Sequence, residues 1–223
     1  EEAVERGAAV LVAERELEGI PEKVTVLVVK DSREALAQLS CAWEDDPAQH
    51  LVTIGVTGTK GKTTTTYMIK AILEAAGQKT GLIGTNGAVI GENHYPTKNT
   101  TPESYILQEY FARMMEEGCR YVVMEVSSQS YLMHRVDGLF FDYGIFLNIS
   151  NDHIGPNEHA SFEEYLYYKK QLLKNCRTAL VNRDDPHFDA IVEGATAKIL
   201  TFSLEQAADF TADDIRYVRE HDF

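Results

Sequence analysis

A short glycine-rich segment has the composition of a phosphate-binding loop. It reads Thr57-Gly58-Thr59-Lys60-Gly61-Lys62-Thr63-Thr64, and an apolar, β-branched run precedes it. Glycines allow backbone N–H groups to surround phosphate oxygens, and a helix that follows the loop directs its positive end toward them. We therefore predict that Lys62 contacts the β- and γ-phosphates of ATP and that the Thr63 hydroxyl is a Mg²⁺ ligand.

This loop is shorter than the usual P-loop. The common pattern has another glycine five residues before Gly61, and Val56 stands at that position. A structural glycine turn with a chance lysine is the alternative interpretation. Because a strand-like run precedes the loop and a helix-like run follows it, nucleotide binding is favoured. The loop residues predicted to contact ATP are Gly58, Thr59, Lys60, Gly61, Lys62, Thr63 and Thr64.

Two further polar side chains follow apolar, strand-like runs. Glu125 ends the run 121–124, and His153 follows the run 144–147 next to Asp152. A carboxylate at the carboxyl end of a parallel strand, beside a phosphate loop, is well placed to hold Mg²⁺. We predict that Glu125 and His153 are metal ligands. The alternatives are a solvated strand end for Glu125 and a structural role for His153.

Strand-like and helix-like runs alternate along most of the chain. The predicted strands are 8–13, 24–29, 51–56, 80–83, 121–126, 143–149, 179–182 and 199–202, with a hairpin at 88–95. The predicted helices are 32–43, 62–76, 103–117, 162–176 and a short one from 186. This alternation predicts an α/β fold whose mostly parallel sheet is covered by helices on both faces.

A break in the pattern at Asp45-Asp46-Pro47 predicts a domain boundary. Residues 1–46 are then the tail of a small α/β domain, and residues 47–223 form a central P-loop-type domain. The chain opens and stops in mid-pattern, which indicates a fragment of a longer protein.

Composition narrows the class of protein. The chain has 223 residues, of which 44% are hydrophobic, and its formal net charge is −14. Such an acidic chain is not expected to bind nucleic acid, and no apolar run has the length of a membrane span. Its three cysteines are far apart and indicate no disulfide framework or metal-binding pair. We expect a cytoplasmic monomer.

Several segments together resemble the Mur ligase family, and within it the branch that makes UDP-MurNAc-tripeptide. They span about residues 51–210. Besides the glycine loop, they are Lys98-Asn99-Thr100-Thr101-Pro102-Glu103, Met124-Glu125-Val126-Ser127-Ser128-Gln129, His134-Arg135-Val136, Asn148-Ile149-Ser150-Asn151-Asp152-His153, Phe162-Glu163-Glu164-Tyr165 with Lys169, and Val181-Asn182-Arg183-Asp184-Asp185.

The resemblance implies roles for further residues. It implies contact between Asn182 and ATP, near the adenine, and a CO₂-modified (carbamylated) Lys169 that is catalytic and helps to hold Mg²⁺. It implies that UDP-MurNAc-dipeptide is bound by Asn99, Thr100, Thr101, Ser127 and Arg135. Residues 1–46 would be part of an N-terminal UDP-binding domain, residues 47–223 an incomplete ATP-binding domain, and the C-terminal domain would be absent.

Plainer interpretations of the same residues stay open. Thr101 and Pro102 could simply begin a helix, with Thr101 as its cap. Arg135 could form an internal salt bridge. Lys169 lies at helical spacing from apolar residues, which places it on or beside a buried face and favours a neutral amine able to react with CO₂. The alternative is an ordinary ammonium that reaches the surface.

The reaction implied by the resemblance joins an amino acid to UDP-MurNAc-L-Ala-D-Glu. ATP phosphorylates the D-Glu side carboxylate, and the amine of the third residue attacks the resulting acyl phosphate. The third residue is meso-diaminopimelate or L-lysine. The alternative functions are a folylpolyglutamate synthase-like ligase, a P-loop switch or transport NTPase, and a non-catalytic ATP-binding module.

Overall fold

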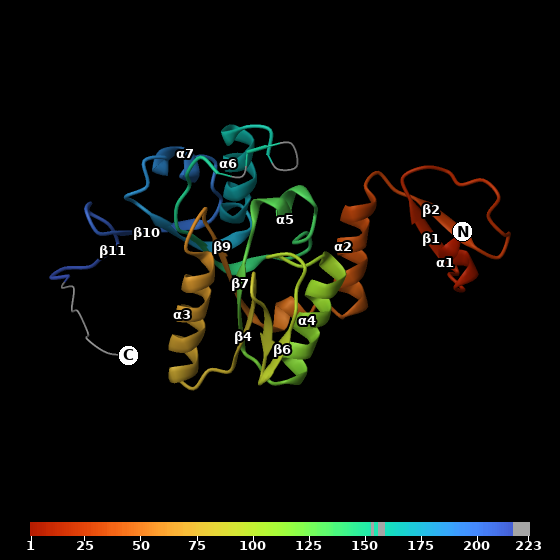
Figure 1. Ribbon diagram of the computed structural model, residues 1–223, viewed down its shortest axis with the longest axis horizontal. Helices are drawn as coiled ribbons and strands as arrows, with labels where there is room; N and C mark the ends of the chain where they lie inside the picture. The colour runs from red at the N-terminus through yellow and green to blue at the C-terminus, as the bar shows by residue number, and fades with distance from the viewer. Residues whose placement is uncertain (153, 156–158, 216–223) are drawn as a thin grey trace.

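The computed structural model describes residues 1–152, 154–155 and 159–215 (Figure 1). Its larger sheet contains β3 (Val52–Thr57), β4 (Thr80–Gly84), β5 (Gly87–Ile90), β6 (Asn93–Tyr95), β7 (Tyr121–Glu125), β8 (Phe141–Phe146), β9 (Cys176–Asn182), β10 (Lys198–Ser203) and β11 (Phe210–Thr211). Its helices are α2 (Ser32–Trp43), α3 (Lys62–Ala75), α4 (Ser104–Glu116), α5 (Ser128–Leu132), α6 (Phe162–Lys170) and α7 (Phe188–Val192), with 3₁₀ turns η1 (Pro47–His50) and η2 (Gln171–Leu173).

These nine strands form one sheet in the order β11-β10-β9-β8-β3-β7-β4-β5-β6. Neighbouring strands pair in parallel from β11 to β4, and the β4–β5 and β5–β6 pairs are antiparallel. The β5–β6 pair is the predicted hairpin. The prediction of a mostly parallel α/β sheet is therefore confirmed.

Alternation along the central strands explains why helices cover both faces. Successive side chains of a strand point to opposite faces. In β7, Val123 packs with α3 residues Ile69 and Leu73, whereas Val122 and Met124 belong to the core cluster that includes α4. Glu125 shares its face with Val123, and this places its carboxylate on the α3 side, where the glycine loop begins the helix.

A small unit precedes the large sheet. It contains α1 (Glu2–Glu5) and the parallel pair β1 (Val10–Ala13) and β2 (Thr25–Val28), and Figure 1 shows it on the far side of α2 from the main body. Helix α2 itself packs against α4, and Gln108 of α4 donates a hydrogen bond to the Cys41 sulfur at 3.1 Å. The domain boundary near residue 46 stays a prediction.

Some predicted element ends were wrong. The helix predicted to reach Cys176 ends at Lys170, continues as η2, and Cys176 begins β9. Leu172 and Leu173 are fully buried, and their apolar side chains continue the helical pattern of the sequence. The backbone at these residues is nevertheless a 3₁₀ turn and not an α-helix. The alternative of a helix whose first residue is Pro102 is wrong, because α4 begins at Ser104, one residue after the predicted start at Glu103.

No helix within the described ranges has the length and apolar character needed to cross a membrane.

Candidate ATP and substrate site

The glycine loop connects the end of β3 to the start of α3. Gly61 is the residue that precedes the helix, and its φ of +86° is a left-handed conformation that favours glycine. Gly58 lies against Leu147, the residue that follows β8, because a Cβ added to Gly58 would be 3.0 Å from the Leu147 Cβ. The backbone therefore turns tightly at two glycines and presents its N–H groups at the helix N-terminus, as a phosphate site requires.

The Lys62 side chain contacts the backbone of its own loop. Its ammonium donates hydrogen bonds to the carbonyl oxygens of Gly58 at 2.8 Å and Thr59 at 3.2 Å. Burial lowers the pKa of Lys62 from its ordinary value. Lys60 differs, because its side chain is 76% exposed and its ammonium lies 2.7 Å from the Asp152 carboxylate. Of the two lysines, Lys62 is the one held inside the loop.

Glu125 and Thr63, two of the predicted metal ligands, lie together. The Thr63 hydroxyl donates to Glu125 Oε1 at 2.9 Å, and the Thr85 backbone N–H donates to the same oxygen at 2.9 Å. Glu125 is only 1% exposed, so the solvated strand end considered from the sequence is wrong. Hydroxyl and carboxylate oxygens are ligands that suit Mg²⁺.

Gly84 provides the space for the Glu125 carboxylate. A Cβ at this position would lie 2.4 Å from Glu125 Oε1. We expect Gly84→Ala to push the carboxylate away from Thr63 and to lower the free energy of unfolding by about 1–3 kcal/mol. Urea unfolding measures the loss of stability. Mg²⁺ should also increase the affinity for ATP by less in the variant than in the wild type. An unchanged unfolding midpoint would contradict this packing.

Lys169 is a buried lysine on α6. It is 2% exposed, its amine donates to the Gly58 carbonyl at 2.8 Å, and it lies 4.8 Å from the centre of the Tyr165 ring. Desolvation and, second, the nearby charge of Lys62 hold the pKa of Lys169 well below its usual range. The alternative of a surface ammonium is therefore wrong. By contrast, Lys170 reaches the Glu193 carboxylate, 3.6 Å away.

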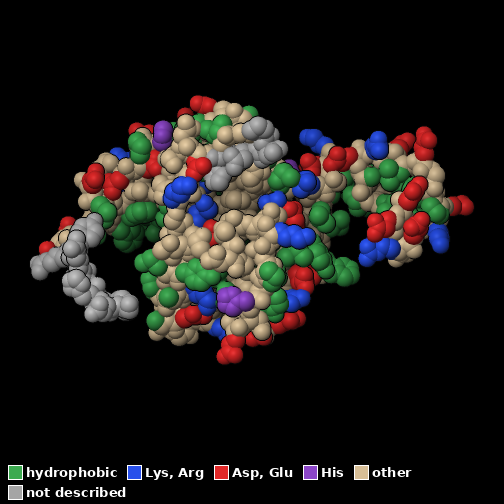
Figure 2. Space-filling model, in the orientation of Figure 1, with side chains coloured by type: hydrophobic (Ala, Val, Ile, Leu, Met, Phe, Trp, Pro, Cys, Tyr) green, Lys and Arg blue, Asp and Glu red, His purple; other side chains and the backbone are tan. Residues whose placement is uncertain are grey.

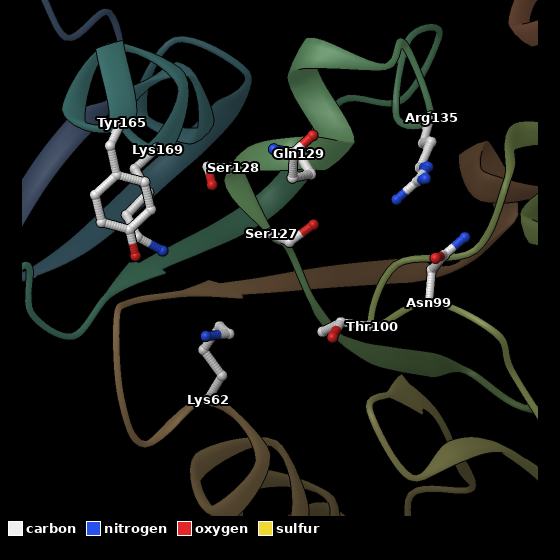
Figure 3. Close-up of a pocket in the computed structure, with 9 residues that line it drawn as sticks. All are labelled: Lys62, Asn99, Thr100, Ser127, Ser128, Gln129, Arg135, Tyr165 and Lys169. Atoms are coloured by element: carbon white, nitrogen blue, oxygen red, sulfur yellow. The ribbon is translucent and has the colours of Figure 1, made fainter. Parts of the chain in front are cut away.

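One cavity of about 220 Å³ joins the phosphate loop to most of the predicted substrate residues. Figure 3 shows Lys62 and Lys169 at one end and Asn99 and Arg135 at the other. The cavity is lined by Lys62, Asn99, Thr100, Ser127, Ser128, Gln129, Arg135, Tyr165 and Lys169. In Figure 2, Lys and Arg side chains gather around the middle of this face although the chain is acidic overall. Such local positive charge suits an anionic ligand.

Thr101 does not line this cavity. It is fully buried, its hydroxyl donates to the Glu125 carbonyl at 2.9 Å, and it accepts a hydrogen bond from the Ser127 N–H at 3.1 Å. Thr101 thus joins the loop before α4 to the end of β7. This geometry does not support the predicted contact between its side chain and the substrate, and it also excludes the helix-cap alternative.

Arg135 is held by three features of its surroundings. It donates to Glu103 Oε1 at 2.8 Å and to the Thr101 carbonyl at 3.5 Å. The preceding residue, His134, has a φ of +55°, and its Nδ1 lies 2.5 Å from the Asp137 carboxylate. That hydrogen bond raises the pKa of His134. The turn at His134 directs the Arg135 guanidinium toward the cavity.

Two predicted contacts lie away from this cavity or outside the described residues. Asn182 donates to the Leu147 carbonyl at 3.0 Å and accepts from the Asp184 N–H at 3.0 Å, so its ATP contact stays a prediction. His153 lies outside the described residues. Within the described ranges, no group of three or more His, Cys, Asp or Glu side chains could hold a metal ion. A Mg²⁺ ion held by a few protein oxygens and by phosphates is compatible with that.

The sequence did not single out Tyr165 or Gln129 as cavity residues, or Glu103 as the partner of Arg135. Their roles depend on which face of a short helix or loop meets the cavity. The Ser128 hydroxyl, at the first residue of α5, lies 2.7 Å from His159 Nε2.

Comparisons with known proteins identify the family of this chain. The pattern of the Mur ligase middle domain matches residues 56–222. The UDP-N-acetylmuramoyl-L-alanyl-D-glutamate--2,6-diaminopimelate ligase of Caldanaerobacter subterraneus subsp. tengcongensis is 43% identical over 217 residues, which are 97% of this chain and 44% of that protein. The protein of the same name from Geobacillus thermodenitrificans is 42% identical over 96% of this chain and 45% of its own length.

Solved structures show the same relationship. A structure named as UDP-N-acetylmuramoyl-L-alanyl-D-glutamate--2,6-diaminopimelate ligase superposes with a TM-score of 0.83 at 29% identity, covering 96% of this chain and 44% of its own. Mycobacterium tuberculosis folylpolyglutamate synthase shares the fold, with a TM-score of 0.58 at 13% identity over 78% of this chain and 48% of its own. This chain spans less than half the length of the relatives named here, and it belongs to the Mur ligase family.

Proposed function

We propose that this chain carries the ATP and UDP-dipeptide sites of a ligase that adds 2,6-diaminopimelate to UDP-MurNAc-L-Ala-D-Glu. The observation that carries the proposal is the single cavity with a phosphate-loop lysine at one end and Arg135 at the other. The names of the relatives favour diaminopimelate over L-lysine. A monomeric state and a cytoplasmic location stay predictions.

The proposed reaction proceeds in two steps. An oxygen of the D-Glu side carboxylate attacks the γ-phosphorus of ATP, the bond to the β-phosphate oxygen breaks, and ADP leaves. The amine of diaminopimelate then attacks the acyl carbon, loses a proton, and phosphate leaves. The first step brings a carboxylate to the anionic γ-phosphate, and the second brings an amine to an anionic acyl phosphate. The main contributions of the protein are therefore positioning and charge neutralisation.

Each end of the cavity has a part in this scheme. Lys62 would exchange its loop carbonyls for the β- and γ-phosphates of ATP. Thr63 and Glu125 would hold Mg²⁺, which would neutralise phosphate charge when bound. Asn99, Thr100, Ser127 and Arg135 would position the dipeptide so that its carboxylate faces the γ-phosphate.

Carbamylation of Lys169 fits the charges of this site. The buried amine lies beside the same Gly58 carbonyl that Lys62 contacts, and two adjacent ammonium groups would repel each other. Reaction of the neutral amine nitrogen with CO₂ forms an N–C bond and releases one proton, which leaves an anionic carbamate. This anion would attract Lys62 and supply a further oxygen for Mg²⁺.

Arg135→Ala tests the assignment of the two ends. In the full-length enzyme we expect the KM for UDP-MurNAc-L-Ala-D-Glu to rise by about 30-fold or more, because the variant lacks the guanidinium that would bind this anionic substrate. The KM for ATP should change by less than about 3-fold. Arg113→Ala is the matched control, because this half-buried arginine of α4 pairs with Glu109 and does not line the cavity; it should leave both constants unchanged. A selective loss of ATP affinity in Arg135→Ala would refute the assignment.

A further inference from the structure

Two predicted substrate donors converge on one carboxylate oxygen of the protein itself. Glu103 Oε1 lies 2.8 Å from an Arg135 guanidinium nitrogen and 3.2 Å from the Asn99 amide nitrogen. Asn99 and Arg135 both line the active-site cavity. A ligand carboxylate that accepted from these same two nitrogens would place an oxygen where Glu103 Oε1 lies.

The Glu103 carboxylate is not used to cap α4. Glu103 precedes the first residue of α4, but its side chain makes no capping hydrogen bond, and it is 45% exposed. Arg135 is only 13% exposed, and its Nε is buried without a hydrogen-bond partner in the structure. Glu103 and the Thr101 carbonyl therefore do not satisfy all donors of the guanidinium.

A second cation lies within reach of the same carboxylate. The Arg33 guanidinium of α2 is 3.9 Å from Glu103 Oε2, and its side chain is 51% exposed. A change of the Glu103 side-chain rotamer could therefore move the carboxylate from Arg135 toward Arg33 without leaving its charge unpaired.

We infer that Glu103 is an internal counter-ion for the substrate site, which the carboxylate of the incoming dipeptide displaces onto Arg33. The inference rests on the proposed function for the identity of that ligand. Two carboxylates at the same edge of the Arg135 guanidinium repel each other. The Glu103 carboxylate must therefore move away from Arg135 when an anionic ligand binds there. In the empty site it keeps Arg135 and Asn99 in their places, and it acts through them as a positioning residue.

Glu103→Gln in the full-length enzyme tests this role. Glutamine keeps the size of the side chain and an acceptor oxygen but removes the competing charge. We expect the KM for UDP-MurNAc-L-Ala-D-Glu to fall about 3- to 10-fold, with kcat and the KM for ATP nearly unchanged. A dipeptide analogue that carries carboxamides in place of the D-Glu carboxylates should gain nothing. Glu116→Gln, at the distant end of α4, is the matched control and should have no effect.

Arg33→Gln should change the KM for the dipeptide in the opposite direction to Glu103→Gln, because it removes the cation that receives the displaced carboxylate. The KM for the dipeptide should rise about 3-fold, and this rise should disappear in the Glu103→Gln background. An unchanged or raised KM in Glu103→Gln, or an Arg33 effect that persists without Glu103, would overturn the inference while the proposed function stands.

The inference can be decided even if the proposed function fails. Failure of the wild-type enzyme to bind or use UDP-MurNAc-L-Ala-D-Glu would refute the proposed function. Glutarate, a simple dicarboxylate, then serves as the probe in a calorimetric titration. Tighter glutarate binding by Glu103→Gln than by the wild type would support the counter-ion role, and equal or weaker binding would refute it.

Discussion

Lys169→Ala is expected to lower the ligase activity of the full-length enzyme by about 1,000-fold or more, and short-chain carboxylates should restore part of it. The amine is 2% exposed, and its pKa lies well below the ordinary value of lysine. A neutral amine is the form that reacts with CO₂, so a lowered pKa extends carbamylation to lower pH. Alanine leaves a cavity in which acetate or propionate can supply the missing anion.

Lys170→Ala is the matched control, because Lys170 is the next residue of the same helix and its ammonium reaches the Ala190 carbonyl and Glu193. Its activity should stay within about 3-fold of the wild type. Removal of CO₂ and bicarbonate should slow the wild type and leave Lys169→Ala unaffected. Full activity in Lys169→Ala would show that no carbamate is needed, and an equal, unrescued loss in both variants would show that the effect is structural.

Lys62→Ala is expected to weaken Mg-ATP binding by about 100-fold or more. Lys62 is the lysine whose ammonium is held inside the loop, next to two carbonyls that phosphate oxygens would replace. Calorimetric titration of the 223-residue chain with Mg-ATP measures the loss.

Lys60→Ala is the control for Lys62. The Lys60 side chain is 76% exposed and paired with Asp152, whereas its backbone N–H is fixed by the Asn148 side chain at 3.0 Å. Neither the exposed side chain nor the occupied N–H is directed at the phosphates, so the variant should retain affinity within about 3-fold. Unchanged affinity in Lys62→Ala would mean that the glycine loop is a structural turn.

The parts of the site that follow local rules could be predicted from the sequence. Strand β3, the glycine loop and α3 are consecutive, so composition alone indicated a helix N-terminus at Lys62. Glu125 ends a run of apolar residues, and its burial follows from the position of that run at the centre of the sheet. The helix of Lys169 was predicted with the correct start, and helical spacing placed the lysine on or beside its buried face.

Contacts between distant segments could not be predicted in this way. Thr101 appeared to be a substrate residue or a helix cap, yet it is buried because its hydroxyl joins the Glu125 carbonyl and the Ser127 N–H. Nothing in the local sequence indicates that Glu103 meets Arg135, which lies 32 positions later. The end of α6 was missed because Leu172 and Leu173, which lie in the 3₁₀ turn, are buried and extend the apolar pattern of the helix.

The central claim is that this site joins an amino acid to a UDP-linked dipeptide through an acyl phosphate. Its most direct test supplies the full-length enzyme with ATP, diaminopimelate and UDP-MurNAc-L-Ala-D-Glu labelled with ¹⁸O in the D-Glu side carboxylate. Mass spectrometry should detect UDP-MurNAc-tripeptide, ADP, and phosphate that contains one ¹⁸O atom from the carboxylate. Tripeptide formation without transfer of ¹⁸O to phosphate would contradict the acyl-phosphate route, and ATP turnover without tripeptide would contradict the ligase itself.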